Sequence, residues 1–399
     1  MSNNNNIPRL RFPGFTGEWE KKKLYDITNN EDNKRRPIAK TERKKGNYPY
    51  YGANGIQDYI DGYLFDGNYL LVGEDGSVLS ENNTPVINWA SGKFWVNNHA
   101  HVLSQKGDYS LKFVSYILST IKIPGLVTGI PPKLNQDNLN NIMVPHPAKP
   151  AEQHKIASCL SEMDYLIAAQ GQKVDSLKEK KKGLMQQLFP QPGESTPQLR
   201  FPGFEDEWSE KKMSDVFTRL TEKNSEDNKN VLTISAQFGL ISQLEFFKKS
   251  VSASDVTGYY LLHRGDFAYN KSSSQGKPVG AIKPLKLYDK GVVSTLYICF
   301  RCKDPNAIGF WEQYFDAGVF DKEIMTIAQE GARNHGLLNV PTNDFFGLSV
   351  KMPKPAEQLK IAECLSSLDE LIASESAKLD SLKDHKKGLM QQLFPQPSK

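Results

Sequence analysis

The twelve residues KKGLMQQLFPQP occur twice in the chain, at 181–192 and again at 386–397. Each copy ends a longer repeat, because residues 149–192 align without gaps to residues 354–397 with 32 identities in 44 positions. An upstream stretch is also repeated: PRLRFPGFTGEWEKKKLYDI (8–27) matches PQLRFPGFEDEWSEKKMSDV (197–216) at 12 of 20 positions. The segments enclosed by these repeats show no obvious similarity to each other. The sequence therefore predicts two different domains within one duplicated framework.

Both copies of the long repeat carry apolar residues at steps of three and four, which is typical of an a/d seam on a long helix. At about 1.5 Å per residue, roughly 38 residues give a rod of about 57 Å. The residues expected to pair the helices are Ile156, Leu160, Met163, Ile167, Val174, Leu177, Leu184, Leu188, Ile361, Leu365, Leu368, Ile372, Leu379, Leu382, Leu389 and Leu393. The polar seam positions are Gln170 and Lys181 in the first copy and Glu375 and Lys386 in the second.

The ends of the two helices are marked in the sequence. Each begins at a proline, Pro150 or Pro355, with a glutamate in the first turn, and each stops at FPQP. A single helix would leave its narrow apolar stripe in water, so we expect the two copies to pair, with antiparallel pairing preferred. The alternative is that each helix packs only on its own globular domain.

The unlike segments, about 28–148 and 217–353, have the pattern of α/β (α+β) domains. Strands are expected at YLLVGE (69–74), FWVNNHAHVL (94–103) and VVSTLYICF (292–300), and short helices at 111–120 and 309–318. We therefore expect a pseudo-two-fold internal repeat: a first domain (1–148), a long helix (149–192), a second domain (193–353), and a second long helix with its tail (354–399).

Composition places limits on the class of protein. The chain of 399 residues is 38% hydrophobic, has four cysteines, and contains no apolar run of the roughly 18–20 residues that a membrane span needs. The start, MSNNNNIPRLRFPGF, has no apolar core of a secretory signal, so we expect a cytoplasmic protein. Residues 1–150 hold 18 Lys and Arg against 14 Asp and Glu, and residues 193–353 hold 19 against 20. Any nucleic-acid surface must therefore come from local clustering of basic residues.

The repeated sequence motifs resemble those of the specificity subunits of type I restriction–modification enzymes, the HsdS family of bacteria and archaea. The resemblance rests on LRFPGF…EW, on the PAEQ.KIA…L helix openings, on the GLMQQLFP ends and on their duplicated order, and covers nearly the whole chain. Residues 48–76 and 94–103 look like one kind of target-recognition domain, and 266–281 and 327–338 like another.

The resemblance implies a non-catalytic chain, not an enzyme, that forms part of an adenine-specific DNA methyltransferase and restriction complex. Each domain would read one half of a bipartite, asymmetric site in double-stranded DNA, while the helices set the spacer and dock two modification subunits, which restriction subunits join. The family implies no cofactor on this chain, with S-adenosylmethionine on the modification subunit and ATP and Mg on the restriction subunit. The alternative is a coiled-coil adaptor whose two domains bind proteins or other ligands.

Base edges and phosphates are contacted by basic and amide side chains, often on loops and turns. The candidate DNA-binding residues in the first domain are Lys34, Arg35, Arg36, Tyr50, Tyr51, Asn54, Lys93, Asn97, Asn98, His99, Lys133 and Asn135. Those in the second domain are Asn270, Lys271, Ser272, Ser273, Gln275, Lys277, Arg333, Asn334 and His335. The plainer alternatives are a solvated loop for 34–36, a simple turn for 52–55 and a strand end for 97–98. His99 and His101 alternate along the expected strand, so one of them is expected to be a core histidine.

Catalytic and metal motifs are weak in this sequence. No GxxxxGK[ST] phosphate loop occurs, which argues against ATP hydrolysis by this chain. Cys299 and Cys302 form a lone CxxC, and a zinc site would need two more ligands. Cys159 and Cys364 occupy matching positions beside the helix seam and are expected to be packing residues. We therefore expect no metal.

Overall fold

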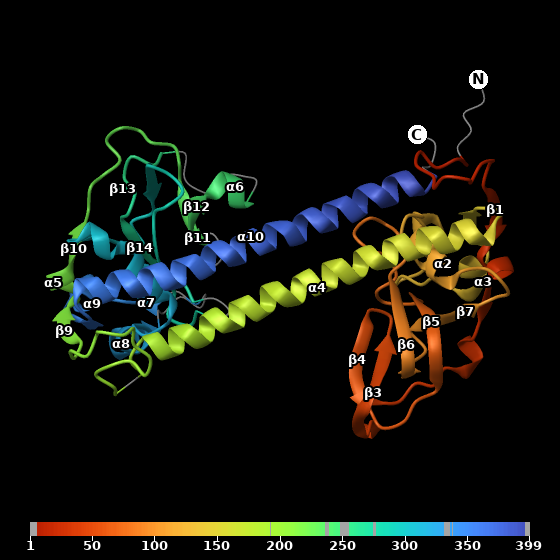
Figure 1. The fold of residues 1–399 in the computed structure, drawn as a ribbon, viewed down its shortest axis with the longest axis horizontal. Helices are drawn as coiled ribbons and strands as arrows, with labels where there is room; N and C mark the ends of the chain where they lie inside the picture. Colours follow the sequence, from red (N-terminus) through yellow and green to blue (C-terminus); the bar gives the residue numbers. More distant parts are fainter. Residues whose placement is uncertain are drawn as a thin grey trace. The chain divides into compact units, whose positions relative to one another are not determined.

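The computed structural model describes residues 6–191, 193–235, 239–247, 255–273, 277–330, 336 and 338–395. The chain divides into two compact units, one of residues 1–171 with 377–399 and one of residues 172–376. Two long helices, α4 (Pro150–Leu188) and α10 (Pro355–Leu393), each contribute one part to both units (Figure 1). The expected pair of long helices with mixed α/β domains is confirmed.

The first unit is built on a six-stranded sheet with the order β2-β7-β5-β6-β3-β4. Its strands are β2 (Thr28–Asn30), β3 (Lys45–Gly52), β4 (Gly55–Ile60), β5 (Phe65–Gly73), β6 (Ile87–Val96) and β7 (Ala100–Gln105). Neighbours are antiparallel except β3 and β6, which are parallel. A separate antiparallel pair joins β1 (Glu20–Lys23) to β8 (Met143–His146). The short helices are α1 (Leu24–Ile27), α2 (Leu111–Leu118) and α3 (Gln136–Asn140).

Local sequence accounts for the elements at the centre of this unit. The last residues of β5, Leu70–Val72, are completely buried, because β6 and β7 flank the strand and α2 packs against it. Helix α2 begins where Ser110 Oγ accepts a hydrogen bond from the Phe113 N–H at 3.2 Å, a standard N-cap. The helix expected over 111–120 is therefore present and ends two residues early.

Two expected strands contain turns. The stretch 94–103 is divided between β6 and β7, because a turn at Asn97–His99 reverses the chain. The stretch 292–300 is likewise divided between β16 (Lys290–Val293) and β17 (Ile298–Cys302). The expectation of continuous strands was wrong at both places. An apolar, strand-like composition continues across each turn and hides the reversal.

The second unit contains a four-stranded sheet with the order β10-β17-β14-β15 and several two-stranded pairs, β11-β12, β13-β16, β18-β19 and β20-β9. The remaining strands are β9 (Ser209–Lys212), β10 (Phe217–Leu220), β11 (Leu232–Ser235), β12 (Gly239–Ser242), β13 (Tyr260–His263), β14 (Phe267–Asn270), β15 (Ala281–Pro284), β18 (Gln329–Glu330), β19 (Leu338–Asn339) and β20 (Ser349–Met352). The helices are α5 (Met213–Val216), α6 (Gln243–Phe247), α7 (Ile308–Asp316), α8 (Asp321–Ile327) and α9 (Thr342–Gly347).

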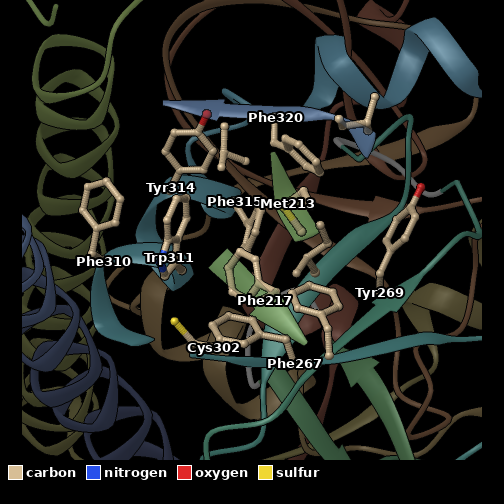
Figure 2. Packing of buried hydrophobic residues seen from close by; sticks show 14 of the residues in the cluster. Met213, Phe217, Phe267, Tyr269, Cys302, Phe310, Trp311, Tyr314, Phe315 and Phe320 are labelled. Carbon is tan, nitrogen blue, oxygen red and sulfur yellow. The ribbon is translucent and has the colours of Figure 1, made fainter. Parts of the chain in front are cut away.

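Aromatic rings dominate the core of the second unit (Figure 2). Phe267 and Phe300 stack with their centroids 5.5 Å apart, and Phe217 meets Phe300 edge-on at 5.0 Å. Helix α7 packs against β15 and contributes Trp311 and Phe315 to the same cluster. Offset and edge-on aromatic contacts add stability beyond the area that they bury. The helix expected over 309–318 is therefore confirmed and forms one wall of this core.

The repeated LRFPGF segments lie on equivalent helix ends. In the first unit, the guanidinium of Arg11 donates two hydrogen bonds to the Glu152 carboxylate at 2.6 and 2.8 Å, and the Leu10 N–H donates to the Gln392 carbonyl at 3.0 Å. In the second unit, the corresponding bonds join Arg200 to Glu357, at 2.7 and 2.9 Å, and Leu199 to Gln187, at 2.9 Å. Each unit therefore combines one LRFPGF segment, the start of one long helix and the end of the other.

The repeated LFP at each helix end fills a domain core. Phe394, at the end of α10, is completely buried against Trp19 and Phe113 of the first unit. Phe189, at the end of α4, is completely buried against Trp208 and aromatic residues of α7 in the second unit. The duplicated phrase is therefore used twice in the same way, each time to complete the hydrophobic core of one unit.

Within each unit the paired parts of α4 and α10 run antiparallel. Every expected seam residue is buried or half-buried. The two lysines among the polar seam positions are ion-paired across the seam: Lys386 contacts Asp164 at 2.5 Å in the first unit, and Lys181 contacts Asp369 at 2.6 Å in the second. A polar seam residue with one favourable partner is a common device for specifying helix register.

Candidate nucleic-acid interface

A cluster of charged side chains lies beneath the loops at one edge of the first unit's sheet. His101, which is 1% exposed, places Nδ1 2.6 Å from Asp32 Oδ2. Arg35 contacts the carboxylates of Asp32 and Glu74 at 3.3 and 2.5 Å, and Lys133 reaches Glu74 at 3.0 Å. The cluster thus links side chains from four separate stretches of sequence.

The pKa values of the two carboxyl groups show that they are stabilised as anions. Burial by itself would raise the pKa of Asp32, but the hydrogen bond and charge of His101, the Val102 N–H and Arg35 together lower it. Burial opposes ionisation of Glu74 as well, and hydrogen bonds from Arg35 and Lys133 outweigh it, so that pKa is also lowered. The same contact with Glu74 raises the pKa of Lys133.

Backbone hydrogen bonds bring three loops to this cluster, at the end of β5. The Glu74 N–H donates to the His99 carbonyl at 2.9 Å, and the Leu134 N–H donates to the Glu74 carbonyl at 2.8 Å. The turn at residues 32–34 is attached through Asp32, whose Oδ1 accepts the Val102 N–H at 2.8 Å. Segments 30–36, 97–99 and 128–135 are therefore neighbours, although the sequence separates them widely.

Six of the predicted DNA-binding residues are exposed on these three segments: Lys34, Arg36, Asn98, His99, Lys133 and Asn135. Several have partners within the domain. Lys34 pairs with Glu31 at 2.7 Å, and His99 Nδ1 lies 2.5 Å from Asp75. Asn135 caps α3 by accepting the Asn138 N–H at 2.8 Å. This group is called the first-domain edge below. It gathers half of the twelve residues predicted in the first domain.

Three other predicted residues direct their polar atoms into the domain. Arg35 belongs to the buried cluster. Tyr50 is 1% exposed and its hydroxyl accepts the Ile38 N–H at 3.0 Å. Asn97 is 3% exposed; its Oδ1 accepts the His99 N–H at 2.8 Å and closes the turn. These contacts indicate a structural role for all three residues; for Asn97 this agrees with the strand-end alternative, whereas Arg35 does not lie in a solvated loop.

The remaining predicted residues of this domain lie on strands β3 and β6 and in the turn between β3 and β4. Asn54 is exposed in the tight turn between β3 and β4, and Lys93 is exposed with its ammonium 4.7 Å from the Tyr63 ring centre. Tyr51 is half-buried and packs edge-on against Phe94 at 5.6 Å. Asn54 and Lys93 therefore remain available for contact, whereas Tyr51 is mainly a packing residue.

In the second unit the two predicted stretches meet. The Ser273 N–H donates to the Gly336 carbonyl at 2.7 Å, and the Leu338 N–H donates to the Lys271 carbonyl at 3.0 Å. The chain around residues 270–273 therefore lies beside Gly336 and Leu338. On its other side, the Asn270 carbonyl is approached closely by Gly280. A Cβ at position 280 would lie 2.1 Å from the Asn270 carbonyl oxygen, so position 280 requires glycine.

The side chains of the stretch 270–277 differ in exposure. Asn270 Oδ1 accepts the N–H of Ser272 at 3.1 Å, and burial lowers the pKa of Lys271. Lys277 donates to the Asp316 carbonyl at 3.3 Å, and Ser273 is exposed. The predicted residues outside the described part of the chain are Gln275, Arg333, Asn334 and His335.

The sequence analysis missed Asp32, Glu74 and His101 as site residues. Their potential ligand atoms lie within 4.8 Å of one another, a spacing that could hold a cation. Arg35 and Lys133 already supply positive charge to these carboxylates, so the donor set suits an internal ion network better than a metal. Two sequence signals could have pointed to this cluster. Asp32 is an acidic residue within a basic loop, and Glu74 directly follows a buried strand.

The CxxC pair is part of the packing. Cys299 and Cys302 are both buried on β17 but belong to different core clusters, because a separation of three residues places them on opposite faces of a strand. Burial raises the pKa of Cys299 to about 12 and that of Cys302 to about 11. These two thiols cannot therefore point into one shared metal site.

Comparison with known proteins agrees with this architecture. Residues 16–179 match the type I restriction modification DNA specificity domain. S.HindORF215P of Haemophilus influenzae, named as a type I restriction enzyme specificity subunit, is 40% identical over 148 residues, and this alignment spans only 37% of each protein. The MjaVIII specificity subunit of Methanocaldococcus jannaschii is 24% identical over 94% of this chain and 92% of its own length.

A solved structure shares the whole fold. The type I restriction–modification S subunit from M. genitalium superposes with a TM-score of 0.66, covering 98% of this chain and all of that one, at 15% identity. The chain is thus similar to type I specificity subunits over residues 16–179 in the family model, over most of its length in a curated relative, and in its fold. Specificity subunits are the non-catalytic components of type I restriction–modification systems. Within the described residues, no helix is long and apolar enough to cross a membrane.

Proposed function

We propose that the chain selects the DNA sequence on which a type I modification and restriction complex acts. Each recognition domain reads one half of a bipartite, asymmetric site, and the helix pair fixes the spacing between the halves. The observation that carries the proposal is the use of one repeated framework around two unlike domains. Unlike domains read unlike half-sites, and a shared framework holds both in an equivalent way.

The chemistry of the first-domain edge suits a DNA groove. Asn98, His99 and Arg36 offer the donors and acceptors that read base edges, and Lys34 and Lys133 offer the positive charge that phosphates attract. Both lysines also have carboxylate partners, so DNA phosphates would compete with Glu31 and Glu74. Binding through such contacts is expected to weaken steeply with salt.

The repeated surfaces suit two copies of one partner. The LRFPGF segments and the ends of the long helices make the same contacts in each unit, so a subunit that recognises one surface would also recognise the other. We propose that two modification subunits dock here and that restriction subunits join through them. S-adenosylmethionine, ATP and Mg would be bound by those partners, with double-stranded DNA as the shared ligand.

The first test is sequencing of methylated bases in cells with and without this gene. A split, asymmetric methylated motif that disappears with the gene is the expected result. If active modification subunits are present and the set of methylated sites is unchanged, the specificity role is wrong.

A second test addresses the spacer. One heptad is inserted into α4 after Gly171 and another into α10 after Ser376, so that the antiparallel seam stays matched. Seven residues add about 10.5 Å of helix, or about three base pairs of duplex DNA. The methylated half-sites should move apart by that amount and keep their sequences. A variant with Gly171 and Ser376 replaced by alanine is the matched control, and an active insertion variant with unchanged spacing would contradict the ruler model.

A further inference from the structure

The second unit contains a cavity of about 260 Å³ beside the start of α10. Lys211 of β9, Met352 of β20 and Gln358 in the first turn of α10 line this cavity. Two buried side chains, Trp311 and Cys302, contribute to its wall (Figure 2). An apolar cavity of about 150 Å³ is enough to bind benzene, so this cavity has room for an aromatic ring.

The duplicated framework gives the cavity a counterpart in the first unit. The repeats and the strand pairs β1-β8 and β20-β9 match three of its lining residues to residues of the first unit: Lys211 to Lys22, Met352 to His146 and Gln358 to Gln153. The contents of the two places can therefore be compared residue by residue.

Tyr109 and Ser110 fill that place in the first unit. The Lys22 ammonium donates a hydrogen bond to the Tyr109 hydroxyl at 2.9 Å. The ring centres of Tyr109 and His146 lie 5.8 Å apart. The Ser110 N–H donates to Gln153 Oε1 at 3.2 Å. Each of the three matched framework residues therefore contacts this tyrosine–serine pair.

The second domain differs at the corresponding point of its chain. Tyr116 of α2 donates to Asp164 at 2.6 Å. Gln313 of α7 donates to Asp369, the matching aspartate of the repeat, at 2.9 Å. Tyr116 and Gln313 are each the sixth residue of their helix, so α2 and α7 correspond to each other. The two residues before α7 therefore correspond to the two residues before α2.

These two residues, Asn306 and Ala307, leave the place open. Asn306 is exposed, and its N–H donates to Asp304 Oδ1 at 2.9 Å. The Ala307 N–H donates to the Asp304 carbonyl at 3.1 Å and is not directed to Gln358. Ala307 lines the cavity, but its side chain ends at Cβ. The turn before α7 therefore supplies neither a ring nor a free backbone N–H.

Two polar groups at the cavity lack partners among the described residues. Gln358 is 2% exposed, and its Nε2 donates to the Pro353 carbonyl at 2.8 Å. No residue in the described part of the chain donates to its Oε1, and within the same residues the Lys211 ammonium has no hydrogen-bond or ion-pair partner. The cavity thus presents a cation and an acceptor that correspond to the groups holding the tyrosine–serine pair in the first unit.

We propose that the cavity is a docking site for a tyrosine in an extended segment of another protein. Lys211 donates to the phenol oxygen, Met352 packs on the ring, and Gln358 Oε1 accepts the N–H of the residue after the tyrosine. The occupant is a protein segment, because the acceptor matched to Gln358 binds a backbone N–H in the first unit.

The site would distinguish the two units for a partner. The first unit fills the same place with its own Tyr109, so the duplicated framework offers this cavity once. A partner that uses it therefore recognises one of two otherwise equivalent units. This inference goes beyond the proposed function and does not depend on it.

The site is tested on the full-length chain with N-acetyl-tyrosine N-methylamide as the probe. The Met352 methyl signal, assigned with Met352→Leu in a methionine-labelled sample, should shift with a dissociation constant of roughly 0.1–1 mM, the range expected for a ligand of this size. The signal of Met143, on the matching strand of the first unit, should stay unchanged. An unshifted Met352 signal at about 10 mM probe would overturn the proposal.

Matched probes test the two polar contacts. N-acetyl-tyrosine methyl ester lacks only the following N–H, and N-acetyl-phenylalanine N-methylamide lacks only the hydroxyl. Each should bind about two- to tenfold more weakly, the loss expected for one hydrogen bond. Lys211→Met should abolish the preference for tyrosine over phenylalanine and keep the preference for amide over ester. An ester that binds as tightly as the amide would mean that the cavity takes free phenols, and the protein occupant would be wrong.

Two variants test the comparison between the units. Ala307→Leu extends a side chain from the wall of the cavity and should remove probe binding, with hydrogen exchange as the check that the second unit stays folded. Tyr109→Ala removes a phenol from the first unit, so added phenol should shift the ring signals of His146 in this variant and not in the wild type. Undiminished probe binding by folded Ala307→Leu, or no binding of phenol to Tyr109→Ala, would contradict the proposed site.

Discussion

Phe394 should contribute to the stability of a domain whose sequence begins almost 400 residues earlier. Its ring is completely buried, with its centroid 5.8 Å from that of Phe113 and 6.4 Å from that of Trp19. Truncation of a buried phenylalanine to alanine costs about 3–5 kcal/mol, which includes the cavity that is left. We therefore expect Phe394→Ala to destabilise the first unit by about that amount.

Hydrogen exchange resolved by mass spectrometry is the suitable assay, because a chain with two units need not unfold in one step. Amides of the first unit that exchange through opening of the whole unit should exchange about 100 to 4,000 times faster, since each 1.4 kcal/mol corresponds to a factor of ten. Amides in the core of the second unit, such as those of β14, should keep their protection.

Phe189→Ala is the matched control, since Phe189 occupies the same place in the repeat and packs on Trp208 in the second unit. It should give the opposite pattern, with faster exchange in the second unit. If Phe394→Ala left the first unit unaffected, or if both variants affected the same unit, the assignment of helix ends to cores would be wrong.

Other predictions concern charge and thiol chemistry. Arg200→Met should cost the second unit about 3 kcal/mol, because Glu357 is left buried without its partner, and Arg11→Met should cost the first unit a similar amount; urea unfolding followed by exchange would measure both. The lowered pKa of Asp32 stabilises the first unit above about pH 4, and this stability is lost as the pH falls through the pKa of Asp32 in the folded protein. The free energy of unfolding of the first unit should therefore fall less between neutral and acidic pH in Asp32→Asn than in the wild type. Burial raises the pKa of Cys299 to about 12, so its alkylation at pH 8 should require unfolding, and rapid labelling of the native protein would contradict its place in the core.

The large features of the fold could be predicted from sequence because they are periodic or repeated. The seam spacing predicts the helices, and the duplication predicts that they are equivalent. Shorter features were harder. The turn at Asn97–His99 lies within a strand-like run, and nothing in its alternation marks where the chain reverses.

The interior of the candidate site could not be predicted for a different reason. Asp32, Glu74 and His101 are separated by 42 and 27 positions, and only the order of strands in the sheet brings them together. Basic loop residues were proposed as DNA contacts on chemistry alone, and Arg35 shows the weakness of that criterion. Its neighbours Lys34 and Arg36 are exposed, whereas Arg35 is held by two carboxylates.

The placement of Phe394 has a consequence for the order of events on the ribosome. The second unit has all the residues of its main core once Val350, Ile361 and Leu365 have been made. The first unit must wait for Phe394, 205 residues after the equivalent Phe189, or about 10–40 s at 5–20 residues per second. The domain that is translated first therefore finishes folding last. Until then its open core can accept the same LFP sequence from another nascent chain, so we expect slow elongation near the 3′ end of the message to favour swapped dimers.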